Sequence, residues 1–374
     1  MRIIEHLGEL KSLLSTYRNI HLYGAGFPAI SFMQGLQACG IQAVIQNVLV
    51  TDVEGNGESC CGLPVVQCNK SALNESDCIL LTVRERLIKE ISEYLEGCGA
   101  EVVYPSPAVF YHDVYDSIKP FIDRFPNSLT GMNVPVDHTG RIVWTCWWQG
   151  EEEAPDIVKA CWKSQRQNLP DGVEHIIITK DNYEKYIVIP GYCLDKFKQG
   201  KNLLAHLSDM LRASLLYKYG GVWLDSTILL TDVLPAECWN YQLYTWNFDN
   251  THFYSKAIWA TWFLAAQKGN VLWQFVMEAF YYYFSVYDKV KYYYTIDYFI
   301  AICSNLFGEV LEQFGQIPYN NEPAAGLIRH LGESYSEEKF REYCRGSFLQ
   351  KLSRHSYNYS TDSIYAHILE KYLL

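Results

Sequence analysis

The chain has 374 residues, with 31 basic and 42 acidic side chains and a formal net charge of −11. Hydrophobic residues make up 49% of the chain and charged residues 20%, a balance that favours a packed globular protein over a disordered one. An acidic chain lacks the basic surface that binding to a phosphate backbone requires, so nucleic acid is not expected as a partner.

No targeting or membrane-spanning segment is recognisable in the sequence. The first residues lack the layout of a signal peptide, and no apolar run reaches the roughly 20 residues that a membrane helix needs. The 12 cysteines are scattered, without a Cys-x-x-Cys motif, which favours reduced thiols over a disulfide scaffold. We therefore expect a cytoplasmic protein, and peripheral association with the inner face of the membrane stays open.

The distribution of tryptophan predicts two units of different kinds. All ten tryptophans lie at or beyond Trp144, and a stretch with proline, asparagine and glycine at 120–135 resembles a connector. The chain is also long for a single core. We expect an N-terminal domain over residues 1–125 and a C-terminal domain over residues 126–374.

Short apolar runs alternate with helical patterns in the first 125 residues, which predicts a small Rossmann-like α/β domain. The turn Gly24-Ala25-Gly26-Phe27-Pro28-Ala29 has the form of a dinucleotide fingerprint. Pro28 interrupts the phosphate turn, however, and no acidic residue closes the second strand, so a scaffold or regulatory role is favoured over cofactor binding. The predicted strands are 19–23, 43–50, 77–82 and 101–104, and the predicted helices end near 39 and span 84–96.

The second domain also begins with a β–α–β pattern. We predict a strand at 141–148, a helix from Pro155 to about 168 and a strand at 175–179. From about Tyr254 the chain is helical and rich in aromatic residues, with clusters at 281–284 and 292–294. Such clusters can stack on sugar rings, but they more often form a helix core, which is the favoured interpretation.

The segment 208–225 carries the strongest chemical pattern. Asp209 and Arg212 are three residues apart on a predicted helix and therefore share a face. Gly220 and Gly221 are expected to end that helix. The apolar strand that follows ends at Asp225, which places this carboxylate at the carboxyl edge of a sheet, where open α/β sheets bind ligands.

Asp225-Ser226-Thr227 places two oxygen-bearing side chains at positions i and i+2, on the same side of an extended chain. Mg²⁺ or Mn²⁺ typically binds through one or two carboxylates together with the phosphates of a substrate. The sequence therefore predicts a cation site at Asp225 and Thr227 that carries a diphosphate. The alternative is a surface ion pair on the helix and an aspartate that caps a turn.

Residues 141–355 resemble the capsular polysaccharide synthesis proteins, relatives of glycosyltransferase family 32 with a GT-A fold. The resemblance rests first on Ser208-Asp209-x-x-Arg212, Tyr217 to Gly221 and Trp223-Leu224-Asp225. Further matching segments are 142–150, 151–155, 262–266 and 315–319. It implies an α/β protein in which a Rossmann-like module precedes a GT-A-type nucleotide-diphospho-sugar transferase domain with a helical, aromatic-rich C-terminal part.

The resemblance also implies roles for individual residues. Asp225 would bind the metal, and Asp225 and Arg212 would be the catalytic residues. Trp148 would stack on the nucleobase of the donor, whereas its neighbour Trp147 has a core position as an equal alternative. The residues implied to bind the donor are Trp148, Trp147, Asp209, Arg212 and Lys351.

Two positions depart from the pattern of that family. The family has Asp-x-Asp where this chain has Asp225-Ser226-Thr227, and it often has a histidine before Lys-Leu-Thr where Gln350 precedes Lys351 here. Thr227 and Gln350 are therefore the expected further metal ligands, and the third metal contact is the weakest part of the prediction.

These observations predict a metal-dependent, retaining glycosyltransferase of the hexosyltransferase type, with Mn²⁺ or Mg²⁺ as cofactor. It would move a sugar from a nucleotide-diphosphate donor to a capsular or surface polysaccharide, or to a lipid-linked glycan. A toxin-like transferase that modifies protein side chains and a non-catalytic nucleotide-sugar-binding protein are the alternatives.

Overall fold

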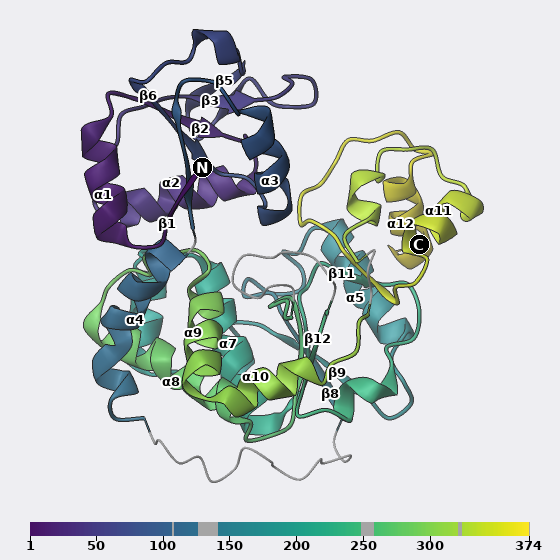
Figure 1. Ribbon diagram of the computed structural model, residues 1–374. Helices are drawn as coiled ribbons and strands as arrows, with labels where there is room; N and C mark the ends of the chain where they lie inside the picture. Colours follow the sequence, from purple (N-terminus) through teal and green to yellow (C-terminus); the bar gives the residue numbers. More distant parts are fainter. Residues whose placement is uncertain (107, 126–140, 248–257, 321–323, 374) are drawn as a thin grey trace. The chain divides into compact units, whose positions relative to one another are not determined.

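The computed structural model describes residues 1–106, 108–125, 141–247, 258–320 and 324–373 (Figure 1). The described residues form two compact units. The first contains Met1–Arg124 and Lys289–Tyr298, and the second contains the other described residues. Most of the connector expected at 120–135 lies outside the described residues, as does the start of the aromatic region near Tyr254.

The first unit is built on a seven-stranded sheet with the order β1-β7-β6-β2-β3-β5-β4. Neighbouring strands are parallel except in the β4–β5 hairpin, so the predicted Rossmann-like α/β architecture is confirmed. The strands are β1 (Arg2–Ile4), β2 (Asn19–Tyr23), β3 (Ile45–Val50), β4 (Ser59–Cys60), β5 (Leu63–Gln67), β6 (Asp77–Leu81) and β7 (Glu101–Pro105). The helices are α1 (Leu7–Thr16), α2 (Phe27–Ala38), α3 (Glu85–Tyr94) and α4 (Ala108–Ile122).

The glycine-rich turn after β2 has a structural explanation that needs no ligand. Gly24 has a φ of 106°, and a Cβ at this position would lie 2.5 Å from Cγ1 of Val83 and 2.9 Å from the carbonyl oxygen of Thr82. Thr82 also donates a hydrogen bond to the carbonyl oxygen of Tyr23 (3.1 Å). The glycine therefore allows the ends of β2 and β6 to approach each other closely.

Helix α4 continues through Pro120, where the sequence had suggested the start of a connector. In the last turn of a helix a proline removes one hydrogen bond, and its ring crowds the carbonyl group four residues earlier. The buried side chains Ile118, Phe121 and Ile122 on either side of it keep the last turn packed. The burial of these apolar side chains therefore outweighs the cost of a proline in the helix.

The segment Lys289–Tyr298 packs within the first unit although it is distant in sequence. The Asp113 carboxylate pairs with Lys291 Nζ (3.0 Å) and accepts a hydrogen bond from Tyr292 (2.9 Å). The Tyr292 hydroxyl also lies 2.9 Å from Cys39 Sγ, and its ring is buried. At Tyr292 the predicted core role of the tyrosine clusters is confirmed, whereas the neighbouring Tyr293 is exposed.

The second unit contains a mixed five-stranded sheet with the order β12-β13-β10-β8-β9. Strands β10, β8 and β9 are parallel, with β9 at the edge of the sheet, and β13 joins β10 in antiparallel orientation. The strands are β8 (Ile142–Cys146), β9 (Glu174–Ile178), β10 (Gly221–Leu224), β12 (Leu243–Thr245) and β13 (Phe263–Ala266), and a separate pair is formed by β11 (Ile228–Leu230) and β14 (Leu349–Lys351). The helices after β8 are α5 (Asp156–Gln167), α6 (Gly191–Lys198), α7 (Leu204–Tyr219), α8 (Val271–Val286), α9 (Thr295–Leu306), α10 (Gly308–Gly315), α11 (Glu337–Cys344) and α12 (Ile364–Leu373).

Helix α7 is buried along most of its length, which fixes the position of its polar side chains. It packs against α8, where Tyr283 and Phe284 are buried and the Tyr281 hydroxyl lies 3.1 Å from Ser214 Oγ. The tyrosine cluster of α8 is thus part of the helix core. With both apolar and polar faces packed, α7 has little freedom to rotate or slide.

Two glycines make the sharp turn from α7 into β10. Gly220 ends the helix with a φ of 69°, and Gly221 begins the strand with a φ of 93°. A Cβ on Gly221 would lie 2.5 Å from the carbonyl oxygen of Ile142, and one on Gly220 would lie 2.6 Å from the amide nitrogen of Lys268. Trp144 Nε1 donates a hydrogen bond to the carbonyl oxygen of Gly220 (2.9 Å) and fixes the turn against β8.

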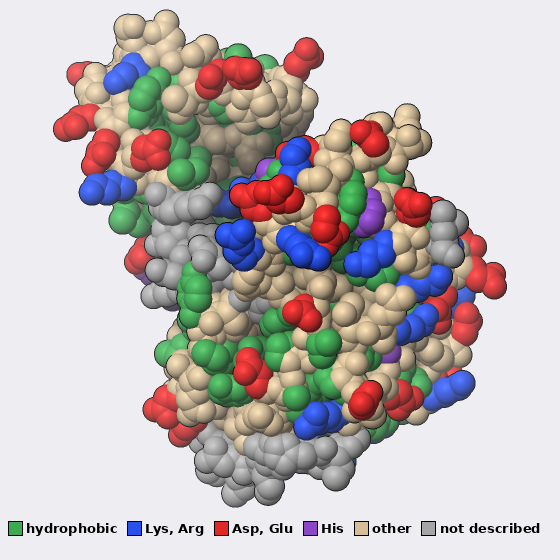
Figure 2. Space-filling view, turned by 90° about the vertical axis from the view of Figure 1, so that its right-hand side faces the viewer, with side chains coloured by type: hydrophobic (Ala, Val, Ile, Leu, Met, Phe, Trp, Pro, Cys, Tyr) green, Lys and Arg blue, Asp and Glu red, His purple; other side chains and the backbone are tan. Residues whose placement is uncertain are grey.

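The described residues expose charged, polar and some hydrophobic side chains. On the face shown in Figure 2, acidic and basic side chains are intermixed. None of the helices that the structure describes is long and apolar enough to cross a membrane. All twelve cysteines are free, and most of them are buried.

We predict that Gly221→Ala destabilises the second unit strongly, because the new Cβ would meet the backbone of β8 and alanine disfavours a positive φ. The expected loss in the free energy of unfolding is about 2–4 kcal/mol. Denaturation followed by tryptophan fluorescence measures this unit selectively, because every tryptophan lies in it.

Gly308→Ala is the matched control. Nothing lies within 4 Å of the Cβ position of Gly308, and its φ is not in the positive region. A change of less than about 1 kcal/mol is expected there. Equal effects of the two substitutions would contradict the explanation of the turn.

Candidate active site

The candidate site forms where β8 and β10 end side by side. In their parallel register Trp144 pairs with Trp223, so the residues after Cys146 and Leu224 emerge at the same carboxyl edge. The amide of Asp225 donates a hydrogen bond to the carbonyl oxygen of Trp262 (3.0 Å), which holds the start of the next turn. The predicted position of Asp225 at the carboxyl edge of the sheet is confirmed.

Arg212 links the two aspartates of the motif. Its Nη2 lies 3.3 Å from Oδ1 of Asp209 and 3.3 Å from Oδ1 of Asp225, and its Nη1 donates a hydrogen bond to the carbonyl oxygen of Thr261. The side chain of Arg212 is only 7% exposed. In this conformation Arg212 therefore positions the two carboxylates, and its planar guanidinium suits contacts in several directions at once.

Trp223 supplies a further contact to the same carboxylate. Its Nε1 donates a hydrogen bond to Oδ1 of Asp225 (2.9 Å), and its ring lies 4.9 Å from the guanidinium carbon of Arg212. The indole is fully buried. Because a cation is attracted to the face of an indole ring, Trp223 stabilises both members of the Arg212–Asp225 pair.

Lys351 reaches the site from a strand that is distant in sequence. Its Nζ lies 3.1 Å from Oδ2 of Asp225 and 2.5 Å from Oγ1 of Thr227. The pairing of β14 with β11 brings it there, since Lys351 pairs with Ile228 and the amide of Leu352 donates to the carbonyl oxygen of Thr227 (2.9 Å). Thr227 and Asp225 thus face the same group, although they lie in a turn and not in an extended strand.

The charges around Asp225 favour its ionised form. Burial by itself would raise its pKa, but the positive charges of Lys351 and Arg212 and the hydrogen bonds from Trp223 and Lys351 outweigh burial and lower the pKa below its ordinary value. Two aspartates and two basic side chains meet here: Asp209, Asp225, Arg212 and Lys351.

Ser226, between Asp225 and Thr227, contacts the end of β8. Its hydroxyl donates a hydrogen bond to the carbonyl oxygen of Cys146 (2.7 Å) and lies 3.0 Å from Oγ1 of Thr145. Ser226 therefore joins the turn to the end of β8. Burial raises the pKa of the Cys146 thiol to about 12, so this cysteine is not a nucleophile at neutral pH.

Trp147 and Trp148 follow β8 but have different surroundings. The ring of Trp147 lies 6.3 Å from that of Trp162 and packs against the apolar cluster around α5 and α12. Both tryptophans are half-buried, and the ring of Trp148 lies 5.1 Å from that of Tyr183. Trp147 thus contacts a core cluster although it is only half-buried, and a role of either ring in binding a base or sugar stays a prediction.

The side chain of Gln350, expected to bind the metal together with Asp225, does not lie beside Asp225. Successive side chains of a strand point to opposite faces, so Gln350 faces away from the group that Lys351 contacts. Gln350 is fully buried, and its Oε1 accepts a hydrogen bond from the amide of Leu327 (3.1 Å). The sequence could not give this result, because the register of β14 was not known.

The residues at this edge do not fit a divalent cation. Both oxygens of Asp225 already face N–H donors, and Thr227 Oγ1 lies against the Lys351 ammonium. The oxygen of Gln350 is directed to a backbone amide. Within the described parts of the chain, no group of three or more His, Cys, Asp or Glu side chains is arranged to hold a metal ion. The chemistry of this donor set is that of an ion-pair network.

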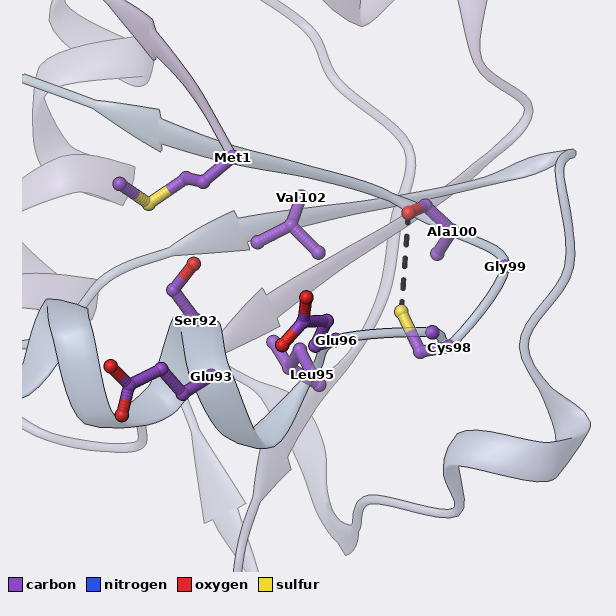
Figure 3. Close-up of a pocket in the computed structure, with 10 residues that line it drawn as sticks. Met1, Ser92, Glu93, Leu95, Glu96, Cys98, Gly99, Ala100 and Val102 are labelled. Carbon is purple, nitrogen blue, oxygen red and sulfur yellow. Dashed lines mark hydrogen bonds between the residues drawn. The ribbon is translucent and has the colours of Figure 1, made fainter.

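Two hollows on the surface lie away from this constellation. One, of about 420 Å³, is lined by Met1, Glu93, Glu96 and their neighbours in the first unit (Figure 3). It lies at the amino ends of β1 and β7, whereas ligands of open α/β sheets bind at the carboxyl ends. The other, of about 400 Å³, is lined by Glu151, Lys163 and other side chains of the α5 region. Neither contains a residue of the Asp225 network.

Comparison with known proteins identifies the class. A family model described as "Capsular polysaccharide synthesis protein" matches residues 109–371. The chain therefore belongs to the capsular polysaccharide synthesis protein family. Together with the α/β architecture this gives the second unit a GT-A-like fold, as the resemblance implied, and the match begins within α4, upstream of β8.

A curated relative matches a short segment of the chain. The chain is 54% identical over 41 residues to "Glycosyltransferase afumC" of Aspergillus fumigatus (strain CBS 144.89 / FGSC A1163 / CEA10). The match covers 11% of this chain and 10% of the length of that relative. The family match covers most of the chain, whereas the match to this relative is confined to a short segment.

We predict that Arg212→Met lowers the free energy of unfolding by about 3–5 kcal/mol, because two carboxylates lose their shared cation in a largely buried setting. Arg212→Lys keeps the charge but cannot reach Thr261, Asp209 and Asp225 at once, and a loss of about 1–3 kcal/mol is expected. Denaturation followed by tryptophan fluorescence measures both values.

Arg166→Met provides the control, because Arg166 pairs with Glu151 on the surface and its side chain is 47% exposed. Exposed pairs contribute less than about 1 kcal/mol. If Arg212→Met were no more destabilising than Arg166→Met, the central role of Arg212 in the network would be refuted.

Proposed function

We propose that this protein is a glycosyltransferase. It would move a sugar from a nucleotide-diphosphate donor to a capsular or surface polysaccharide, or to its lipid-linked precursor, with retention at the anomeric carbon. The observation that carries the proposal is the Asp225–Lys351 pair at the carboxyl edge of β10. Both side chains are about one quarter exposed, at 25% and 27%, so they are accessible to a ligand. The family to which the chain belongs supports the choice of acceptor.

The neighbouring groups suit the two ends of such a donor. An ammonium group attracts phosphate oxygens, and the partly exposed ring of Trp148 offers an aromatic face for a base. Trp148 follows the end of β8 by two residues, at the same edge of the sheet as Asp225. Asp225 would orient Lys351 and remain ionised, with Arg212 and Asp209 behind it.

The proposed transfer breaks the bond between the anomeric carbon and the β-phosphate oxygen, and both electrons of that bond go to the oxygen. The anomeric carbon forms a bond to an acceptor hydroxyl oxygen, whose proton passes to the departing phosphate or to water. The main demand on the protein is stabilisation of the charge on the leaving diphosphate. The metal dependence that the resemblance implies has no support in this donor set.

A cytoplasmic location is part of the proposal. The twelve cysteines are free, and thiols of this number persist in a reducing compartment. Nucleotide sugars would be supplied by a reaction that activates a sugar on a nucleoside triphosphate. Association with the inner face of the membrane would bring the chain to a lipid-linked acceptor.

Asp225→Asn should lower the release of nucleoside diphosphate from the preferred donor by about 100-fold or more, since asparagine cannot hold Lys351 and Arg212 by charge. The variant should stay folded, with a thermal midpoint within about 5 °C of wild type. A panel of nucleotide sugars, assayed for slow hydrolysis and for transfer to glycan acceptors, gives the measurement.

The matched control is Asp195→Asn, an exposed aspartate on α6 that pairs only loosely with Lys198 (3.9 Å). Its turnover should equal that of wild type. Wild-type protein that turns over no nucleotide sugar, or an Asp225→Asn variant that keeps full turnover, would refute the proposed function.

A further inference from the structure

The Lys351 ammonium occupies the place that the sequence motif assigned to a divalent cation. It lies against Oδ2 of Asp225 and Oγ1 of Thr227, the two oxygens expected to bind the ion. The other carboxylate oxygen of Asp225 faces Trp223 Nε1 and Arg212 Nη2. A metal ion bound to both Oδ2 and Oγ1 would therefore lie directly beside the Lys351 ammonium, where the two positive charges repel each other.

The backbone around Lys351 holds it in this position. Its amide donates a hydrogen bond to the carbonyl oxygen of Ala324 (2.6 Å), and the next amide, that of Leu352, donates to Thr227 (2.9 Å). Lys351 and Ile228 are directly paired between β14 and β11. The strand pairing that presents Lys351 is thus the same pairing that closes the turn after Asp225.

The ammonium keeps one donor for a ligand. A lysine Nζ carries three N–H groups, and two of them face Asp225 and Thr227. Within the described residues no further partner of Nζ is found, and the side chain is 27% exposed. A phosphate oxygen of the donor is a suitable acceptor for the third N–H, because an ammonium binds phosphate as a point charge.

The charges of the site are already balanced without a metal ion. Asp209 and Asp225 carry two negative charges, and Arg212 and Lys351 carry two positive charges. A divalent cation would add two positive charges beside two cationic side chains, whereas a donor diphosphate brings negative charge. The site is therefore better suited to bind the anionic diphosphate than to bind a metal ion.

We propose that Lys351 takes the place of the divalent cation: it binds the diphosphate of the donor, and transfer is metal-independent. This inference rests on the proposed function and concerns the same site. Asp225 then acts as the positioning residue that holds the ammonium toward the diphosphate. Thr227 is its second anchor.

The test uses the full chain, freed of metal on a chelating resin and assayed with and without EDTA. We expect release of nucleoside diphosphate from the preferred nucleotide sugar to change by less than about twofold when EDTA is replaced by Mn²⁺ or Mg²⁺. Binding of the free nucleoside diphosphate, measured by calorimetry, should be equally indifferent to EDTA. Turnover or binding that requires an added metal would overturn the inference and leave the proposed function standing.

Substitutions of Lys351 test its direct role. Lys351→Met should weaken binding of the nucleoside diphosphate in EDTA at least about tenfold and lower turnover by about 100-fold. Lys351→Arg, which keeps a cation at the position, should recover most of the binding. Lys163→Met, an exposed lysine on α5, is the control and should match wild type. A Lys351→Met variant that binds and turns over normally would overturn the inference.

The binding and turnover results distinguish a failure of the proposed function from a failure of the role assigned to Lys351. If the wild type neither binds any nucleoside diphosphate nor turns over any nucleotide sugar, with or without metal, the proposed function fails and the inference fails with it. If turnover is present but is lost in EDTA, only the role assigned to Lys351 fails.

Discussion

The candidate site is organised around a single carboxylate that three parts of the chain share. Asp225 accepts from Trp223 on its own strand, pairs with Arg212 on α7 and pairs with Lys351 on β14. A carboxylate that is partly withdrawn from water is costly unless its oxygens are paired, so each of these contacts constrains the others. The positions of α7, β10 and β14 are thereby coupled at the edge of the sheet where a ligand would bind.

The local backbone makes this arrangement attainable. The Gly220–Gly221 turn lets β10 start directly after α7 and lie against β8, which brings Arg212 beneath the end of the strand. The buried packing of α7 on α8 prevents Arg212 from turning outward. The exposed part of the network is accordingly limited to Asp225 and Lys351, and a ligand meets one anionic and one cationic side chain whose geometry is already set.

Sequence reasoning identified the parts of this site that local spacing encodes. The spacing of Asp209 and Arg212, the two glycines and the carboxylate after a short strand are all local features, and the structure places them as expected. The Lys351 contact depends on the β11–β14 pairing between residues more than a hundred positions apart, and no local pattern gives its register. The same register places the Gln350 side chain on the face of β14 opposite to Lys351, where it accepts a hydrogen bond from the amide of Leu327. Trp223 was assigned to a buried strand, but its hydrogen bond to Asp225 depends on a side-chain orientation that the sequence does not contain.

The most direct test of this account is a crystal structure of the full chain with its preferred nucleoside diphosphate, grown in the presence of EDTA. The account predicts the diphosphate at the carboxyl edge of β8 and β10, within hydrogen-bond distance of Lys351 Nζ, with the base near Trp148. A nucleotide bound at the Gly24 turn of the first unit would contradict it. So would a diphosphate at the Asp225 edge with Lys351 turned away from it.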